Sequence, residues 1–198
     1  TDGKRPVDTN VFFTRLGQRM IHILTTQTRL GDLYEVDMRL RPSGNSGMLV
    51  SSLKAFTDYQ YKTAGPWEHQ ALVRARVVAG DAELAARFER VRREVLEQPR
   101  EEAALKIDVR DMREKMRDHL LPAGLEGGEK PVFHLKHGTG GIVDIEFMVQ
   151  YAVLAWSHQY PALSVYTDNV RILDALNTEG LWEESEVLAL AESYKDFR

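Results

Sequence analysis

The chain has 198 residues, which suits one large domain or two small ones, and its 43% apolar content is enough to form a core. The formal net charge of -4 provides no overall basic field, so the composition predicts no nucleic-acid partner. The chain has no cysteine, which excludes disulfides and fits a reducing cytoplasm, and no apolar run approaches a membrane span.

The first predicted element is a helix over residues 10–28, capped by Thr9 or Asn10. Its apolar residues recur at helical spacing and form one stripe: Phe13, Leu16, Met20, Ile23 and Leu24. Gly31 and Asp32 then turn the chain into an extended segment.

Residues 33–42 alternate at period two and predict a half-buried strand that ends at Pro42. One face is apolar, with Tyr34, Val36, Met38 and Leu40. The other face carries two acids followed by two bases, namely Glu35, Asp37, Arg39 and Arg41. Carboxylates followed by guanidiniums suit a metal ion beside a phosphate chain.

A flexible loop, a short strand at 48–50 and a helix starting at Ser51 or Ser52 follow. Residues 70–79 again alternate, with Ala71, Val73, Ala75, Val77 and Ala79 on one face. We expect this second strand to pair antiparallel with residues 33–42, which would add Arg74 and Arg76 to the polar front.

From residue 81 onward the pattern predicts essentially only helices. The expected helices are 81–98 (capped at its start by Gly80-Asp81 and ended by Pro99), 101–120, a central helix at 142–158 that is apolar on nearly all sides, 168–178 with Gly180 as its stop, and 183–197. The expected class is therefore α+β and mostly helical, with residues 1–98 and 99–198 as two domains and a glycine-rich loop at 122–131.

Asp37 is the strongest candidate for chemistry. Aspartate is depleted in strands, and the guanidiniums outnumber the carboxylates on this face, which leaves positive charge for phosphate. Asp37, with Glu35, would then bind Mg²⁺, and Asp37 could accept a proton from an attacking hydroxyl. The alternative is an aspartate simply paired with Arg39, Arg74 or Arg76 on a sheet surface.

The second candidate is the run Lys136-His137-Gly138-Thr139-Gly140-Gly141 ahead of a helix that contains Asp144 and Glu146. Backbone amides of a glycine turn can hold an anion, so Lys136 and Asp144 are candidates for the wall of a nucleotide cleft. Alternatively, the two acids stabilise the helix dipole with Lys136 as their partner. The six histidines show no metal-ligand spacing.

Four segments together resemble one family. They are Tyr34-Glu35-Val36-Asp37-x-Arg39-Leu40-Arg41-Pro42-Ser43-Gly44, Gly47-Met48-Leu49-Val50, Trp67-Glu68-x-x-Ala71-Leu72-x-x-Ala75-Arg76-Val77-Val78, and Gly140-Gly141-Ile142-x-Asp144-Ile145-Glu146-Phe147. They resemble glutamine synthetase adenylyltransferase, the bifunctional bacterial enzyme that adenylylates and deadenylylates glutamine synthetase. The details are most similar to its C-terminal, adenylylating half.

The resemblance implies a partial polymerase-β-like nucleotidyltransferase sheet followed by a helical bundle. Asp37 matches the third carboxylate of that superfamily, whereas the Gly-Ser and Asp-x-Asp elements are absent. The chain thus looks like a fragment that is inactive alone.

The implied reaction is the Mg²⁺-dependent transfer of AMP from ATP to a tyrosine of glutamine synthetase, in the cytoplasm. The implied phosphate contacts are Arg39, Arg41, Arg74 and Arg76. The implied regulator is a PII-type signal protein. Two alternatives stay open. One is the phosphorolytic adenylyl-removing half of the same enzyme, and the other is a non-catalytic helical module that binds glutamine synthetase or the PII-type protein.

Overall fold

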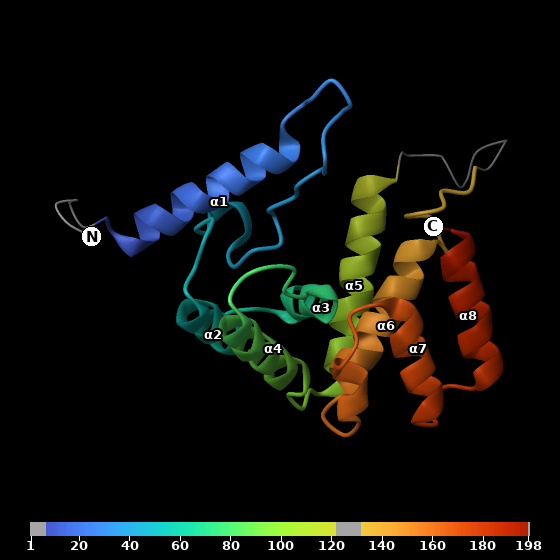
Figure 1. Ribbon diagram of the computed structural model, residues 1–198. Coiled ribbons are helices and arrows are strands. Elements are labelled where there is room, and N and C mark those ends of the chain that lie inside the picture. The colour runs from blue at the N-terminus through green and yellow to red at the C-terminus, as the bar shows by residue number, and fades with distance from the viewer. Residues whose placement is uncertain (1–6, 122–131, 198) are drawn as a thin grey trace. The chain divides into compact units, whose positions relative to one another are not determined.

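The computed structural model describes residues 7–121 and 132–197, so the glycine-rich loop at 122–131 lies outside the described residues. The chain forms two compact units, Thr1–Ala64 (unit 1) and Gly65–Arg198 (unit 2). The expected domain boundary near residue 98 lies within unit 2, between two of its helices. Figure 1 shows the helices of both units, which are described one at a time below.

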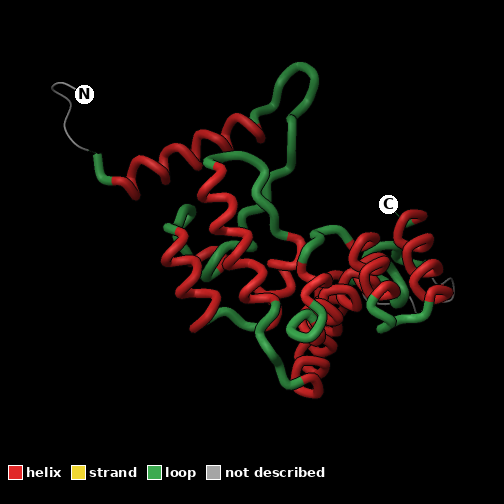
Figure 2. The backbone as a smooth tube through the Cα atoms, turned by 60° about the horizontal axis from the view of Figure 1, so that its bottom comes forward, coloured by secondary structure: helices red, strands yellow, loops and turns green. Residues whose placement is uncertain are grey.

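The expected α+β class with a polymerase-β-like sheet is wrong. In residues 7–121 and 132–197 every regular element is a helix, and the only β-type pairing is an isolated antiparallel bridge between Thr28 and Gly31. Figure 2 accordingly shows helices joined by loops.

Residues 33–42 are not a strand, although their alternation predicted one. Residues 34–38 have no regular structure, and the chain turns at residues 39–43. A strand needs a neighbour for its backbone N–H and C=O groups, and none of the described segments pairs with this one. Residues 48–50 lack a strand for the same reason.

The second predicted strand, residues 70–79, was wrong for a different reason. Its first half belongs to helix α3 (Pro66–Arg74), and the chain leaves the helix at Ala75. Pro66 occupies the first turn, and the Glu68 carboxylate accepts a hydrogen bond from the N–H of Gly65 at 3.1 Å. Proline at a helix start and glutamate at the third position are helix-start signals, and here they outweigh the alternation.

Unit 1 contains α1 (Thr9–Thr25), the short 3-10 helix η1 (Gly44–Ser46) and α2 (Leu53–Lys62). Both α-helices were predicted. The Asp8 carboxylate caps α1 by accepting from the N–H groups of Asn10 and Val11, and the Ser52 hydroxyl caps α2 by accepting from that of Ala55. The predicted cap of α2 is confirmed, whereas α1 begins at Thr9 and is capped by Asp8 instead of Thr9 or Asn10.

Unit 2 contains α3, α4 (Ala82–Leu96), α5 (Glu102–Leu120), α6 (Ile142–Trp156), the 3-10 helix η2 (Pro161–Ser164), α7 (Asn169–Thr178) and α8 (Glu184–Asp196). Helix α6 contacts α3, α5, α7, α8 and η2, so the prediction of a central apolar helix is confirmed. Its buried residues include Val149, Val153 and Leu154, which are fully inaccessible. No described helix is long and apolar enough to cross a membrane.

Gly180 ends α7 as predicted. It adopts φ 69°, its N–H donates to the Asn177 carbonyl at 2.9 Å, and the N–H of Leu181 donates to the Leu176 carbonyl at 2.9 Å. This pair of bonds defines a Schellman cap, in which glycine takes the left-handed conformation without steric cost.

Two arginines, one fully buried and one partly buried, hold unit 2 together. Arg92 on α4 has no exposed surface, and its guanidinium donates to the backbone carbonyls of Leu72, Val73, Ser164 and Tyr166 at 2.8–3.2 Å and to the Glu89 carboxylate at 2.7 Å. Arg100 donates to the carbonyls of Val95, Leu96, Gln98 and Leu154. These carbonyls lie in the last turn of a helix or just beyond it, where few intrahelical donors are available. Burial lowers the pKa of both guanidiniums, to about 10 for Arg100.

Candidate functional site

Asp37 lies in the irregular segment of unit 1, paired with Arg39. Its carboxylate accepts the backbone N–H of Arg39 at 2.8 Å and three bonds from the guanidinium at 2.6–3.0 Å. The Arg39 side chain, and next its backbone N–H, lower the pKa of Asp37 to about 2. Both side chains are well exposed, at 49% for Asp37 and 75% for Arg39, so the pair contributes little to stability.

Arg41 is used differently from Arg39. Its guanidinium donates to the backbone carbonyls of Met38 at 2.5 Å, Asn45 at 3.2 Å and Gly47 at 3.3 Å. These bonds close the 42–47 loop, in which a side chain on Gly47 would place Cβ 1.9 Å from the Pro42 oxygen. The predicted phosphate contact of Arg41 stays a prediction, and in this structure Arg41 shapes the loop.

A magnesium ion requires more ligands than this segment supplies. Glu35 and Asp37 are exposed carboxylates, but both oxygens of Asp37 accept from Arg39. The described parts of the chain hold no group of three or more histidine, cysteine, aspartate or glutamate side chains placed to bind a metal. Because Mg²⁺ prefers octahedral oxygen coordination, these two carboxylates do not make a metal site unaided.

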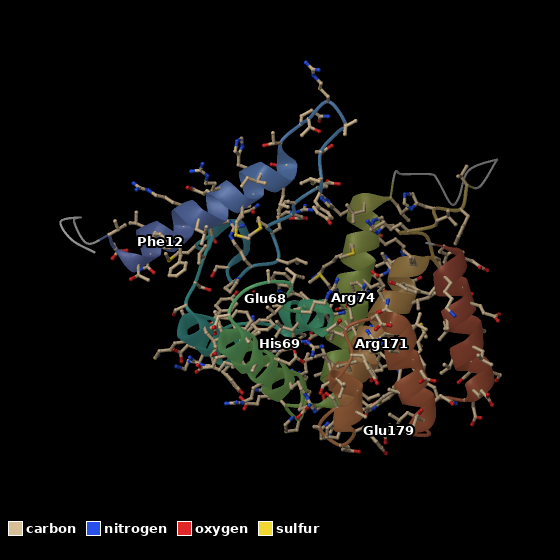
Figure 3. The ribbon with its side chains drawn as sticks, viewed as in Figure 1. Phe12, Glu68, His69, Arg74, Arg171 and Glu179 are labelled. Atoms are coloured by element: carbon tan, nitrogen blue, oxygen red, sulfur yellow. The ribbon has the colours of Figure 1, made fainter. Side chains whose placement is uncertain are left out.

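Arg74 and Arg76 do not lie on a strand beside Arg39, since the expected pairing is absent. Arg74 is the last residue of α3, in unit 2, and is labelled in Figure 3. It donates to the Glu146 carboxylate at 3.2 Å and the Tyr194 hydroxyl at 3.4 Å, and Tyr194 donates to Glu146 at 3.3 Å. This cluster joins α3, α6 and α8, while Arg76 is exposed in the segment that follows α3.

Asp144 lies in the first turn of α6 and pairs with a buried arginine of α5. Arg113 donates to Asp144 at 2.5 Å and to the carbonyls of His137 at 3.0 Å and Gly138 at 3.4 Å. The side chain of Arg113 is 8% exposed and that of Asp144 is 24% exposed. The expected partner of Asp144 and Glu146 was Lys136, whose side chain is exposed; the structure pairs these acids with Arg113 and Arg74 instead.

The glycine turn before α6 uses its amides internally. Gly140 N–H donates to the second oxygen of Asp144 at 2.6 Å, and the amides of Gly141, Ile142 and Val143 donate to carbonyls of the turn at 2.9–3.2 Å. A Cβ on Gly141 would lie 2.7 Å from the Leu135 oxygen, so the turn is closely packed. The carboxylate of Asp144 therefore occupies the position where an external anion was expected to bind.

The sequence did not point to Arg92, Arg100, Arg113 or Tyr194 as residues with a specific role. An arginine on an apolar helix stripe is the only signal that was available, as at position 92 between Val91 and Val95. Its carbonyl partners are distant in sequence, since Arg92 and Ser164 are 72 positions apart, and only the tertiary structure identifies them.

Comparison with known proteins first shows that two parts of the chain are similar to families named for nucleotidyl transfer. Residues 1–91 match the family described as glutamate-ammonia ligase adenylyltransferase, and residues 110–198 match GlnD PII-uridylyltransferase. Both names describe enzymes that transfer a nucleotidyl group.

The relatives identify the family more closely. Over the whole chain, the proteins named bifunctional glutamine synthetase adenylyltransferase/adenylyl-removing enzyme are 54% identical in Hahella chejuensis, 56% in Pseudomonas aeruginosa and 54% in Nitrosococcus oceani. The chain belongs to this family, which confirms the resemblance inferred from its motifs. It spans about a fifth of the length of these relatives, 21%, 21% and 20% respectively.

Proposed function

We propose that the chain is part of an enzyme that uses ATP and Mg²⁺ in the cytoplasm to transfer AMP to a tyrosine of glutamine synthetase. The observation that carries this proposal is the identity of 54–56% across all 198 residues to enzymes named for that activity. The 34–44 segment, with its acid-acid-base-base order, is the part of the chain best suited to the chemistry.

The Asp37–Arg39 pair supports a role at the reacting phosphates. Exposed ion pairs contribute at most about 1 kcal/mol to stability. Breaking the Asp37–Arg39 pair so that each side chain can bind a ligand therefore costs little. A guanidinium can grip a phosphate bidentately, and the freed carboxylate can face a cation or a tyrosyl proton. Carboxylates from outside the described residues would have to complete any magnesium site.

The test compares Asp37→Asn with Asp32→Asn in an enzyme of full length. Asp32 is an exposed aspartate of the same unit and serves as the matched control. We expect Asp37→Asn to reduce AMP transfer to glutamine synthetase by at least about 100-fold, as loss of a charged group at a transition state does. Full activity in Asp37→Asn would remove Asp37 from the proposal, while equal losses in both variants would indicate a folding defect.

The relatives' printed name also includes adenylyl removal, so the same segment is a candidate for the phosphorolytic release of AMP. The two assignments are separated by assaying the full-length Asp37→Asn enzyme both for AMP transfer to glutamine synthetase and for AMP release from it. Loss of AMP transfer alone favours the adenylylating role, and loss of AMP release alone favours the adenylyl-removing role.

A binding role for unit 2 is supported by the match of residues 110–198 to a PII-uridylyltransferase. Under this alternative α5–α8 bind glutamine synthetase or a PII-type protein without taking part in chemistry. Titration calorimetry of the 198-residue chain with each protein tests it, and the absence of heat with both would reject it.

A further inference from the structure

The guanidinium of Arg113, on α5, is buried and uses only two of its three nitrogens. Nε donates to the Asp144 carboxylate at 2.5 Å, and Nη2 donates to the carbonyls of His137 at 3.0 Å and Gly138 at 3.4 Å. The third nitrogen, Nη1, is also buried and has no hydrogen-bond partner among the described residues. A buried donor without a partner carries the full cost of its lost hydration. Nη1 therefore requires an acceptor that these residues do not supply.

His137 contributes a second unpaired atom in the same part of unit 2. It lies in the glycine turn that precedes α6, and its Nδ1 atom is buried without a partner in residues 7–121 and 132–197. The two residues are already joined, because Nη2 of Arg113 bonds the His137 carbonyl. Burial, and next the positive charges of Lys136, His134 and Arg113, lower the pKa of the His137 ring. The ring is therefore neutral at pH 7.

The charges of this cluster favour a neutral ligand. The Arg113 charge is matched by the Asp144 carboxylate, so a further buried anion would lack a countercharge there. Of the other cations nearby in sequence, Lys136 is exposed and Arg117 donates to the Thr139 hydroxyl at 3.2 Å. A cation as ligand is disfavoured by the guanidinium itself.

Water suits both unpaired atoms. It accepts a hydrogen bond from a guanidinium nitrogen, and it can donate to or accept from a neutral imidazole nitrogen, whichever tautomer is present. An internal water needs two to four polar partners, and Nη1 and Nδ1 supply two. Such waters are an ordinary part of protein interiors, where they satisfy buried polar groups that side chains do not reach.

We propose that one internal water molecule lies between α5 and the glycine turn and bonds both Nη1 of Arg113 and Nδ1 of His137. Every nitrogen of the guanidinium then has a partner. The water adds to the link between α5 and the start of α6, which Asp144 and the turn carbonyls already make directly. The inference concerns unit 2 alone and does not depend on which reaction the enzyme catalyses.

A high-resolution crystal structure of the 198-residue chain tests the proposal. We expect one spherical density peak at about 2.7–3.2 Å from both Nη1 of Arg113 and Nδ1 of His137. His137→Phe keeps an aromatic ring but removes Nδ1, so the peak should be lost. His137→Asn is the matched control, because its amide returns a polar atom near the place of Nδ1, and here the peak should be retained.

The opposite results would overturn the proposal. The absence of a peak, or a peak that persists in His137→Phe, would mean that these two atoms do not hold a water together. Density continuous with the polypeptide would identify another part of the chain as their partner, and an anomalous bromide signal after a sodium bromide soak would identify an anion. The wild-type crystals alone can reject the proposal, so the test does not depend on whether His137→Phe folds.

Discussion

Replacing Arg92 by methionine should strongly destabilise unit 2. The methionine side chain fits an apolar site, but it leaves the Val73, Ser164 and Tyr166 carbonyls without the donor that the guanidinium supplies. The Leu72 carbonyl keeps the N–H of Ala75 as a partner. These losses act directly on the junction of α3, α4 and the segment after η2.

The magnitude follows from the number of groups left unsatisfied. Each buried group without a partner costs about 1–3 kcal/mol, and the guanidinium's own desolvation, which is relieved, offsets part of the total. We therefore expect Arg92→Met to lower the free energy of unfolding by about 3–5 kcal/mol and Tm by about 10 °C. Arg92→Lys should recover less than half, since an ammonium cannot reach four carbonyls in a planar fork.

Urea denaturation followed by tryptophan fluorescence measures this change. All three tryptophans, Trp67, Trp156 and Trp182, lie in unit 2, so the signal reports that unit alone. Arg90→Met, at an exposed position of the same helix, is the matched control and should change the unfolding free energy by less than about 0.5 kcal/mol. A cost for Arg92→Met below about 1 kcal/mol would refute the reasoning, because it would mean that these carbonyls find other partners readily.

Three further predictions concern charged groups. In a urea double-mutant cycle, Arg113→Met and Asp144→Leu should show a coupling of about 1–3 kcal/mol, and additive effects would mean that the buried pair does not act as a unit. Carboxyl NMR should place the pKa of Asp37 near 2 and find it raised toward the ordinary 3.8 in Arg39→Gln; an unchanged value would assign the shift to another group. Burial lowers the pKa of His137 below its ordinary 6.5, and Lys136 adds to this. The folded state then binds fewer protons than the unfolded state, so unit 2 should lose stability as pH falls through and below 6.5, and His137→Gln should flatten that part of the profile.

The helices from α4 onward could be predicted because each is specified by local chemistry. Asp81 and Asp168 cap their helices, Gly180 ends α7, and the apolar spacing between them is helical. These signals act within a few residues, so they do not depend on the rest of the fold. The family could be recognised for a similar reason, since its motifs are short and contiguous.

Other features depended on contacts that no local pattern contains. Residues 33–42 alternate like a strand, but a strand exists only where a neighbour accepts its backbone bonds, and the described residues provide none. Residues 70–74 carry the same alternation, yet Gly65, Pro66 and Glu68 start a helix there, and the burial of Leu72 and Val73 beside Arg92 holds it.

The ion pairs show the same division between local and tertiary information. Asp37 and Arg39 are two residues apart, so their pairing is among the outcomes that the sequence allows. Arg113 with Asp144, Arg74 with Glu146 and Arg92 with distant carbonyls are separated by 19 to 74 residues. Composition and spacing determined which segments form helices and to which family they belong. The partner of each buried charge was decided only when the helices packed, because desolvation makes an arginine select whichever carbonyl or carboxylate the tertiary structure brings within reach.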